Sequence, residues 1–151
     1  MRIGLIADTH GLLRPEAIVA LRECEQLIHA GDIGKPEILY DLRKLAPLHV
    51  VRGNNDRGLP WADDLPDHLL IPFGDWAVYL THEMAHVPKE LPDSVRVVVT
   101  GHSHKPLVQA KDGVLFVNPG SAGPRRFKLP VSVALLEASP AGPEVRLLTL
   151  G

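Results

Sequence analysis

Residues 97–104, Val-Val-Val-Thr-Gly-His-Ser-His, constrain the fold of this chain more than any other stretch. Three successive β-branched residues predict a strand that is buried on both faces. The strand ends at Gly101, and two histidines separated by one residue follow at once. Neutral imidazoles at the end of a strand can point toward one metal ion. His102 and His104 are therefore candidate metal ligands, although such a pair also occurs in solvated loops.

The first third of the chain alternates between strand and helix patterns. Apolar runs predict strands at residues 2–7, 26–30 and 48–51, and helices over 15–23 and 36–45. Each helix begins with a proline, which suits the first turn. This β-α-β-α-β order implies parallel strands with right-handed crossovers, and such sheets bind ligands at the carboxyl ends of their strands.

After Pro60 the pattern changes to short strands joined by tight turns. Three hairpins are predicted, which pair residues 69–73 with 76–80, 107–110 with 114–117, and 131–137 with 144–150. Two helices and many strands indicate an α/β chain with two sheets packed face to face and helices outside. The length of 151 residues is typical of one domain, which we expect to cover residues 1–151.

Side chains that can bind metals stand at the ends of the predicted strands. They are Asp8, His10, Asp32, Asn54, His82, His102 and His104. Such mixed oxygen and nitrogen donors suit Mn²⁺, Fe²⁺, Ni²⁺, Co²⁺ or Zn²⁺ better than Mg²⁺ or Ca²⁺. Seven ligands are too many for one catalytic ion. They suit two ions that share a bridging carboxylate and a bridging hydroxide, an arrangement used for in-line displacement at phosphorus.

These residues belong to sequence blocks that resemble the calcineurin-like metallophosphoesterases, in particular their small bacterial and archaeal phosphodiesterases. The blocks are Asp-Thr-His-Gly at 8–11, Gly-Asp at 31–32, Gly-Asn-Asn-Asp at 53–56, Thr-His at 81–82 and Gly-His-Ser-His at 101–104. Asn-Pro-Gly-Ser at 118–121 and Pro-Arg at 124–125 also resemble this subgroup. The resemblance implies a four-layer α-β-β-α sandwich, the metallo-dependent phosphatase fold.

The resemblance also implies how two metal ions are held. One ion would be bound by Asp8, His10, Asp32 and His104. The other would be bound by Asp32, Asn54, His82 and His102, so that Asp32 bridges the two. We expect two divalent ions, with Mn²⁺ as the first choice and Ni²⁺, Fe²⁺, Co²⁺ or Zn²⁺ as alternatives.

Two departures from the family pattern bear on the reaction. Many relatives carry a histidine where this chain has Asn55, and there it contacts the phosphate and is a candidate to protonate the leaving group. Asn55 can donate a hydrogen bond to the phosphate but cannot deliver a proton. Glu83 and Met84 replace the glycine and histidine of similar proteins beside His82, which alters the rim of the site.

Two further residues complete the catalytic candidates. Asp56 is expected to orient a ligand or to cap a turn. Arg125 follows a glycine-rich loop and is expected to hold a phosphate oxygen, unless it forms a solvated pair with Arg126. His29 lies inside a strand and is interpreted as a buried, hydrogen-bonded histidine. Cys24 is interpreted as a small buried hydrophobe.

The sequence predicts a dinuclear metal-dependent phosphodiesterase in which a metal-bridging hydroxide attacks phosphorus in line. A phosphomonoesterase with the same site is the near alternative. A non-catalytic scaffold or interaction module is another, because the retromer scaffold subunit resembles a degraded phosphoesterase. A scaffold need not retain both histidines of residues 101–104 together with His10, so their presence favours the enzyme.

Charge and hydropathy limit the partners. The net charge of −2 comes without a basic stripe, so we expect no nucleic acid held through bulk charge. A small phosphoester, with a nucleotide among the candidates, remains the expected substrate. No apolar run reaches membrane-spanning length, and no signal peptide or cysteine pair is recognised, so a cytoplasmic location is expected. Assembly into a homo-oligomer is left open.

Overall fold

A computed structural model describes residues 1–150. Its elements, in chain order, are β1 (Arg2–Ile6), α1 (Pro15–Leu21), β2 (Gln26–His29), α2 (Pro36–Arg43), β3 (Leu48–Val50), the single-turn 3₁₀ helix η1 (Pro60–Ala62), β4 (His68–Phe73), β5 (Trp76–Thr81), the 3₁₀ helix η2 (Met84–His86), β6 (Val95–Val99), β7 (Leu107–Lys111), β8 (Val114–Asn118), β9 (Ser132–Ser139) and β10 (Gly142–Thr149).

Two five-stranded mixed sheets pack face to face, as the sequence predicts. The first has the order β10-β9-β1-β2-β3, and the second has the order β4-β5-β6-β8-β7. Strands β1, β2 and β3 run parallel, while β9 and β10 form an antiparallel hairpin at one edge. In the second sheet β5, β6 and β8 run parallel, with β4 and β7 antiparallel at the two edges. The three predicted hairpins are confirmed.

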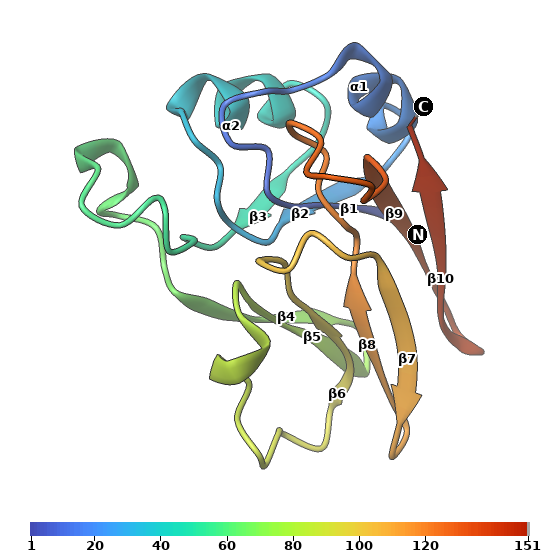
Figure 1. Cartoon of the computed structure of the whole chain (residues 1–151). Helices are drawn as coiled ribbons and strands as arrows, with labels where there is room; N and C mark the ends of the chain where they lie inside the picture. The colour runs from blue at the N-terminus through green and yellow to red at the C-terminus, as the bar shows by residue number, and fades with distance from the viewer. Residues whose placement is uncertain (151) are drawn as a thin grey trace.

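Alternation along the strands creates the layers. In β1, Ile3 and Leu5 point into the apolar core between the two sheets, and Ile6 points into a second core beneath the helices. Helices α1 and α2 lie together on the outer face of the first sheet, and the second sheet lies on its other side (Figure 1). The chain therefore has the predicted α/β sandwich fold.

The outer face of the second sheet has a thinner cover. Tyr79, Val95 and Val98 form a small cluster there, with Val87 and Leu91 packed against it. These last two residues belong to the segment that follows η2, so this layer consists of one 3₁₀ turn and an extended segment. No helix within residues 1–150 is long and apolar enough to span a membrane.

The predicted central strand is confirmed, and the predicted ends of the two helices differ from the structure. Val97, Val98 and Val99 are fully buried at the centre of the second sheet, which confirms a strand covered on both faces. Both helices end two residues earlier than predicted. After α1 the chain turns through a Cys24 N–H to Leu21 C=O bond, and α2 ends before Pro47, whose ring disfavours helical backbone in the preceding residue.

Candidate metal centre

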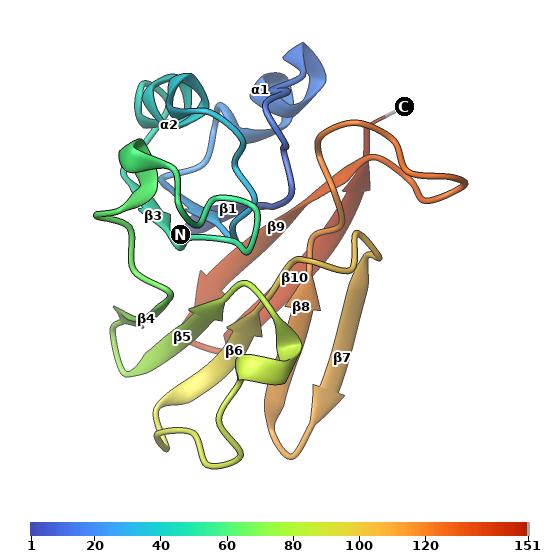
Figure 2. The ribbon, with the colours of Figure 1, turned by 60° about the vertical axis from the view of Figure 1, so that its left-hand side comes forward.

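The strand ends of both sheets meet at one place. Asp8 and His10 follow β1, Asp32 follows β2, and Asn54 follows β3. In the second sheet His82 follows β5, while His102 and His104 follow β6. The arrowheads of β5, β6 and β8 point toward the same end of that sheet (Figure 2). The structure therefore brings all seven predicted ligands to the carboxyl ends of parallel strands, where α/β sheets bind ligands.

The backbone is unusual at this place. Five of the seven candidate ligands have a left-handed backbone: Asp8 (φ 54°), His10 (45°), Asp32 (56°), His102 (72°) and His104 (64°). Across residues 1–150, the only other non-glycine residues with positive φ are Asp112 and Phe127. This conformation costs on the order of 1–3 kcal/mol per residue, and it persists where surrounding contacts enforce it, commonly at functional sites.

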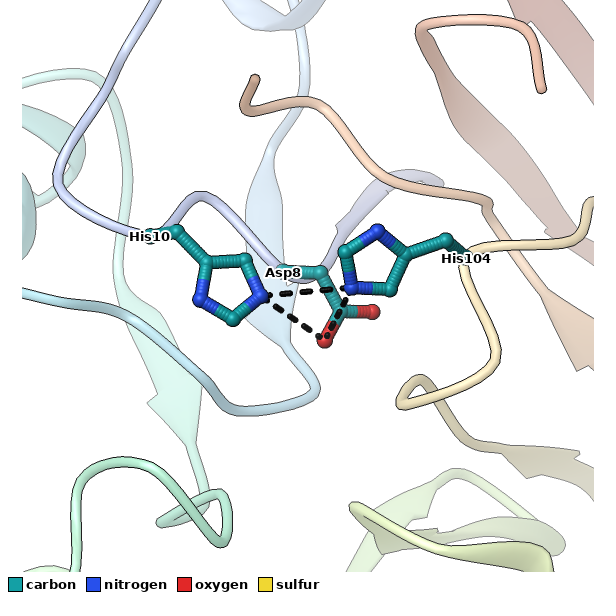
Figure 3. A group of neighbouring side chains, drawn as sticks. All are labelled: Asp8, His10 and His104. Carbon is teal, nitrogen blue, oxygen red and sulfur yellow. Dashed lines mark hydrogen bonds and ion pairs between the residues drawn. The ribbon is translucent and has the colours of Figure 1, made fainter. Parts of the chain in front are cut away.

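Asp8, His10 and His104 form one group whose potential ligand atoms lie within 4.8 Å of one another (Figure 3). The two imidazoles face each other with 3.2 Å between their Nε2 atoms. Asp8 Oδ2 accepts a hydrogen bond of 3.0 Å from the backbone N–H of His102. Its other oxygen, Oδ1, is buried and has no hydrogen-bond partner among the described residues.

The unpartnered Asp8 Oδ1 is surrounded by histidine nitrogens. The Nε2 atoms of His104, His10 and His82 lie 3.7, 3.9 and 3.9 Å from it. Because these distances exceed those of good hydrogen bonds, the oxygen is desolvated without compensation. A divalent cation between the carboxylate and the imidazoles would supply the missing partner, so these residues fit a metal ion.

Asp32, His82 and His102 form a second group of the same kind. His82 Nδ1 donates to the Ala30 carbonyl at 2.7 Å, so in the neutral ring the lone pair of Nε2 faces the site. Two oxygens lie opposite this lone pair, Asp32 Oδ2 at 3.2 Å and Asn54 Oδ1 at 2.9 Å. Three electron-rich atoms at one point require a proton or a cation, which again fits a metal site.

Asp32 lies within reach of both groups. Its Oδ2 is 3.2 Å from Nε2 of His82 in the second group and 3.7 Å from Nε2 of His10 in the first. Its Oδ1 accepts a hydrogen bond of 2.9 Å from the backbone N–H of Asn55, which holds the carboxylate in this orientation. Asp32 therefore lies near candidate ligands of both groups, and the bridging role that the resemblance implies stays a prediction.

Burial and neighbouring charges shift the pKa values of these side chains. Burial raises the pKa of Asp8 to about 7. Burial also lowers the pKa of His10, and it lowers the pKa of His104 to about 4 with a further contribution from the positive charge of Arg126. Both imidazoles are consequently neutral at pH 7, which is the form that binds a metal. For Asp32, burial is the largest single influence and raises the pKa, but the hydrogen bond and charge of His82, the Asn55 N–H and the charge of His10 together lower the pKa below its ordinary value.

Close backbone packing holds the ligands. A Cβ atom on Gly53 would lie 2.2 Å from Asp32 N and Asp32 Oδ1. A Cβ atom on Gly101 would lie 2.9 Å from Asp8 Oδ2. The glycines of these sequence blocks therefore allow the loops from the two sheets to approach the carboxylates.

The structure separates the three catalytic candidates. Asn55 is exposed at the rim, and its Nδ2 lies 3.4 Å from Asp32 Oδ2. Asp56 is fully buried, and it accepts hydrogen bonds from the backbone N–H groups of Ile33 and Gly53. It therefore caps and orients the loops, which is one of the two roles expected for it. Arg125 is exposed in the loop after residue 123.

The structure shows roles near the site for three residues, Arg126, His102 and Glu83, that the sequence did not predict. The sequence suggested only that Arg126 could form a solvated pair with Arg125. In the structure the positive charge of Arg126 acts to lower the pKa values of Asp8, His10 and His104. His102 Nδ1 is 3.1 Å from Asn54 Oδ1, while its Nε2 is 3.6 Å from Glu83 Oε1. Glu83 can thus orient the His102 ring from behind, a role that only its unusual position beside His82 hinted at.

Two residues outside the ligand set are as interpreted from the sequence. His29 is fully buried, accepts a hydrogen bond from Gly31 N–H at Nδ1, and lies 3.0 Å from Thr9 Oγ1 through Nε2. Burial lowers the pKa of His29 to about 3, so it stays neutral. Cys24 is a buried free cysteine, and burial raises the pKa of its thiol to about 11.

The fold and this site define a class of protein: an α/β sandwich with two adjacent groups of candidate metal ligands at one end of its sheets. Residues 1–140 match the calcineurin-like phosphoesterase superfamily domain, and the chain belongs to this family. A probable metallophosphoesterase of Methanothermobacter thermautotrophicus is 34% identical over 136 residues, which cover 80% of this chain and 77% of that protein.

Solved structures show the same fold. An archaeal phosphodiesterase superposes with a TM-score of 0.75 at 25% identity, covering 98% of this chain and all of the other. Vps29 from Chaetomium thermophilum superposes with a TM-score of 0.77 at 20% identity, covering 99% of this chain and 96% of that one.

Proposed function

We propose that this chain is a dinuclear metal-dependent phosphodiesterase. The proposal rests on one observation. Two groups of candidate ligands lie side by side at one end of the sandwich, and Asp32 is close to both. Asp8, His10, Asp32 and His104 would hold one ion, and Asp32, Asn54, His82 and His102 the other. Membership of a phosphoesterase family and similarity to an archaeal phosphodiesterase support hydrolysis of phosphodiesters.

Two bound divalent cations would lower the pKa of a water molecule so that it can attack phosphorus, and would offset charge on the phosphate oxygens. The protein's own groups orient the substrate. Asn55 is exposed beside Asp32, so its amide N–H can donate to a phosphate oxygen. The charge of Arg126 attracts the anionic ester toward the site.

The leaving group receives no proton from Asn55, because an amide cannot act as a general acid. The proposal therefore includes a preference for esters with acidic leaving groups, or for a proton supplied by water. Mn²⁺ is the ion we propose first, among the borderline ions that suit mixed carboxylate and imidazole donors. We also propose a cytoplasmic location, with which one buried, unpaired cysteine is consistent.

The test is hydrolysis of bis-p-nitrophenyl phosphate against p-nitrophenyl phosphate. Metal-stripped protein is reconstituted with Mn²⁺, Ni²⁺, Zn²⁺ or Mg²⁺, and bound metal is counted by mass spectrometry. We expect metal-dependent turnover that favours the diester and falls by about a hundredfold or more in Asp32→Ala and His104→Ala. Asp75→Ala is the matched control, because Asp75 is exposed in the turn between β4 and β5, at the opposite end of β5 from His82.

Other outcomes would identify the alternatives. Faster turnover of the monoester would indicate a phosphomonoesterase with the same site. Two bound ions without turnover of either ester would indicate a non-catalytic module of the same fold.

A further inference from the structure

A cavity of about 410 Å³ adjoins the candidate metal centre on the side of the second sheet. Its lining includes Met84, His102, Ser103, Lys105, Pro106 and Leu107. His102 is shared with the second ligand group, so the cavity lies next to the place where that group would hold a phosphate. Its volume is within the range of about 300–1,000 Å³ that small-molecule sites occupy.

The walls of this cavity, the Met84 pocket, are apolar at Met84, Pro106 and Leu107, which come from separate elements, while Thr100, Lys105 and Asn118 add polar groups to the lining. Met84 begins η2 and is 45% exposed, while Leu107 begins β7 and is 37% exposed. Single exposed apolar side chains are ordinary, but here two of them line the same hollow with Pro106 beside a candidate catalytic site. Methionine adds a polarisable sulfur that contacts aromatic rings favourably.

One polar group in the pocket has a free proton. Ser103 Oγ accepts hydrogen bonds from Lys105 N–H at 3.2 Å and from Asn118 Nδ2 at 3.1 Å. Within residues 1–150 its own hydroxyl proton has no acceptor. Asn118 is held rigidly, because it also donates to the Gly101 carbonyl and accepts from Gly120 N–H. The pocket therefore offers apolar surface from Met84, Pro106 and Leu107, a positioned hydroxyl donor at Ser103, and Lys105 as a second donor in its lining.

We propose that the Met84 pocket binds a heteroaromatic ring of the nucleobase type, carried by the phosphoester whose phosphate lies at the metal centre. Such a ring combines flat apolar faces with hydrogen-bond acceptors on its edge, which match the walls and Ser103. A polyol or sugar would leave the apolar walls without a partner and would lose its own hydration. This inference rests on the proposed function, and it identifies the substrate as a nucleotide ester.

Met84 and the candidate metal ligand His102 line the same cavity. Met84 belongs to neither group of candidate metal ligands, so a substitution there alters the rim next to His102 and keeps all the ligands. The pocket thus concerns which ester is bound rather than how it is cleaved.

The experiment compares adenosine 5′-monophosphate with ribose 5-phosphate by titration calorimetry on the Mn²⁺-reconstituted protein. The two probes share the phosphate and the ribose and differ only in the base. We expect the nucleotide to bind about tenfold more tightly or better. Met84→Ser and Leu107→Ser should each remove about threefold to tenfold of this advantage and leave ribose 5-phosphate within about twofold. Ser103→Ala should weaken only the nucleotide.

Leu70→Ser is the control, since Leu70 is 49% exposed on the edge strand β4 and does not line the pocket. Equal affinity of the wild-type protein for both probes would overturn the pocket assignment and leave the phosphoesterase proposal intact. Equal weakening of both probes in Met84→Ser would also overturn it, because η2 would then act on the phosphate site. Failure of both probes and of inorganic phosphate to bind would instead contradict the metal centre itself.

Discussion

Asp8 is a single residue whose buried carboxylate lowers the stability of the metal-stripped protein at neutral pH. Its carboxyl group is fully buried, and burial raises its pKa from an ordinary value of 3.8 to about 7. In metal-stripped protein, the unfolded chain therefore ionises at lower pH than the folded chain. The contribution of Asp8 to the free energy of unfolding falls as pH rises from about 4 to about 7, by on the order of 4 kcal/mol.

Asp8→Asn should remove this penalty. Without metal at pH 8, we expect the variant to be more stable than the wild type by about 2–4 kcal/mol, and at pH 4 the difference should largely vanish. The same variant should lose metal binding at the first group. Urea unfolding of metal-stripped protein at both pH values measures the effect, with Asp75→Asn as the exposed control. A difference that does not change with pH would contradict the raised pKa.

Asn55 governs a different property, the choice of leaving group. Its exposed side chain beside Asp32 can bind a phosphate oxygen but cannot protonate an alkoxide. Asn55→His should therefore raise kcat/KM about tenfold or more on the dinucleotide thymidylyl-thymidine, whose leaving group is an alcohol. The variant should change little on bis-p-nitrophenyl phosphate, whose leaving group needs no proton. Unchanged turnover of the dinucleotide, measured by chromatography, would count against a missing general acid.

Loops rather than helices or strands are the elements that shape this site, and Asp56 joins two of them. Its carboxylate accepts backbone hydrogen bonds of 3.0 Å from Ile33 in the loop after β2 and of 3.0 Å from Gly53 in the loop after β3. A further bond of 3.2 Å comes from Gly34. Each buried N–H left without an acceptor costs roughly 1–3 kcal/mol.

Asp56→Ala should consequently lower the free energy of unfolding by about 3 kcal/mol and weaken metal binding. Asp56→Asn keeps one acceptor oxygen, so its free energy of unfolding should lie between those of Asp56→Ala and the wild type. Denaturant unfolding and Mn²⁺ titration provide the two measurements. A loss of turnover with unchanged stability and metal affinity would instead make Asp56 a catalytic residue that contacts the substrate.

The whole molecule is joined at the candidate metal centre, because the first sheet supplies Asp8, His10, Asp32 and Asn54 and the second supplies the remaining three ligands. A metal ion bound there links loops of both sheets. At a free concentration about a hundred times Kd, binding to the folded state alone adds about 2.7 kcal/mol, which corresponds to a rise of about 5–10 °C in Tm for a chain of this size.

Thermal unfolding with increasing Mn²⁺ tests this link between the sheets. Tm should rise in the wild type and in Asp75→Ala, fall back when a chelator is added, and stay constant in Asp32→Ala. If bound metal left the wild-type Tm unchanged, the ions would not be held by the folded arrangement described above.

Local sequence patterns account for the parts of the fold that could be predicted from the sequence. Strand positions follow from runs of β-branched residues and from turn residues, so the consecutive buried valines of β6 and the three hairpins were predictable. The gathering of the candidate ligands was predictable as well, because parallel strands end on the same edge of a sheet. The helix ends were less so, since the last turn depends on competing contacts such as the bond from Cys24 to Leu21.

By itself the sequence determined the sandwich, the order of its strands along the chain and which side chains gather at their ends. Only the tertiary structure decided how these side chains face one another: the unpartnered oxygen of Asp8, the orientation of His102 between Asn54 and Glu83, and the hollow beside Met84. The reason is physical. Burial and hydrogen bonding within a strand repeat along the chain, whereas the direction of a side chain is set by neighbours from segments far away in the sequence.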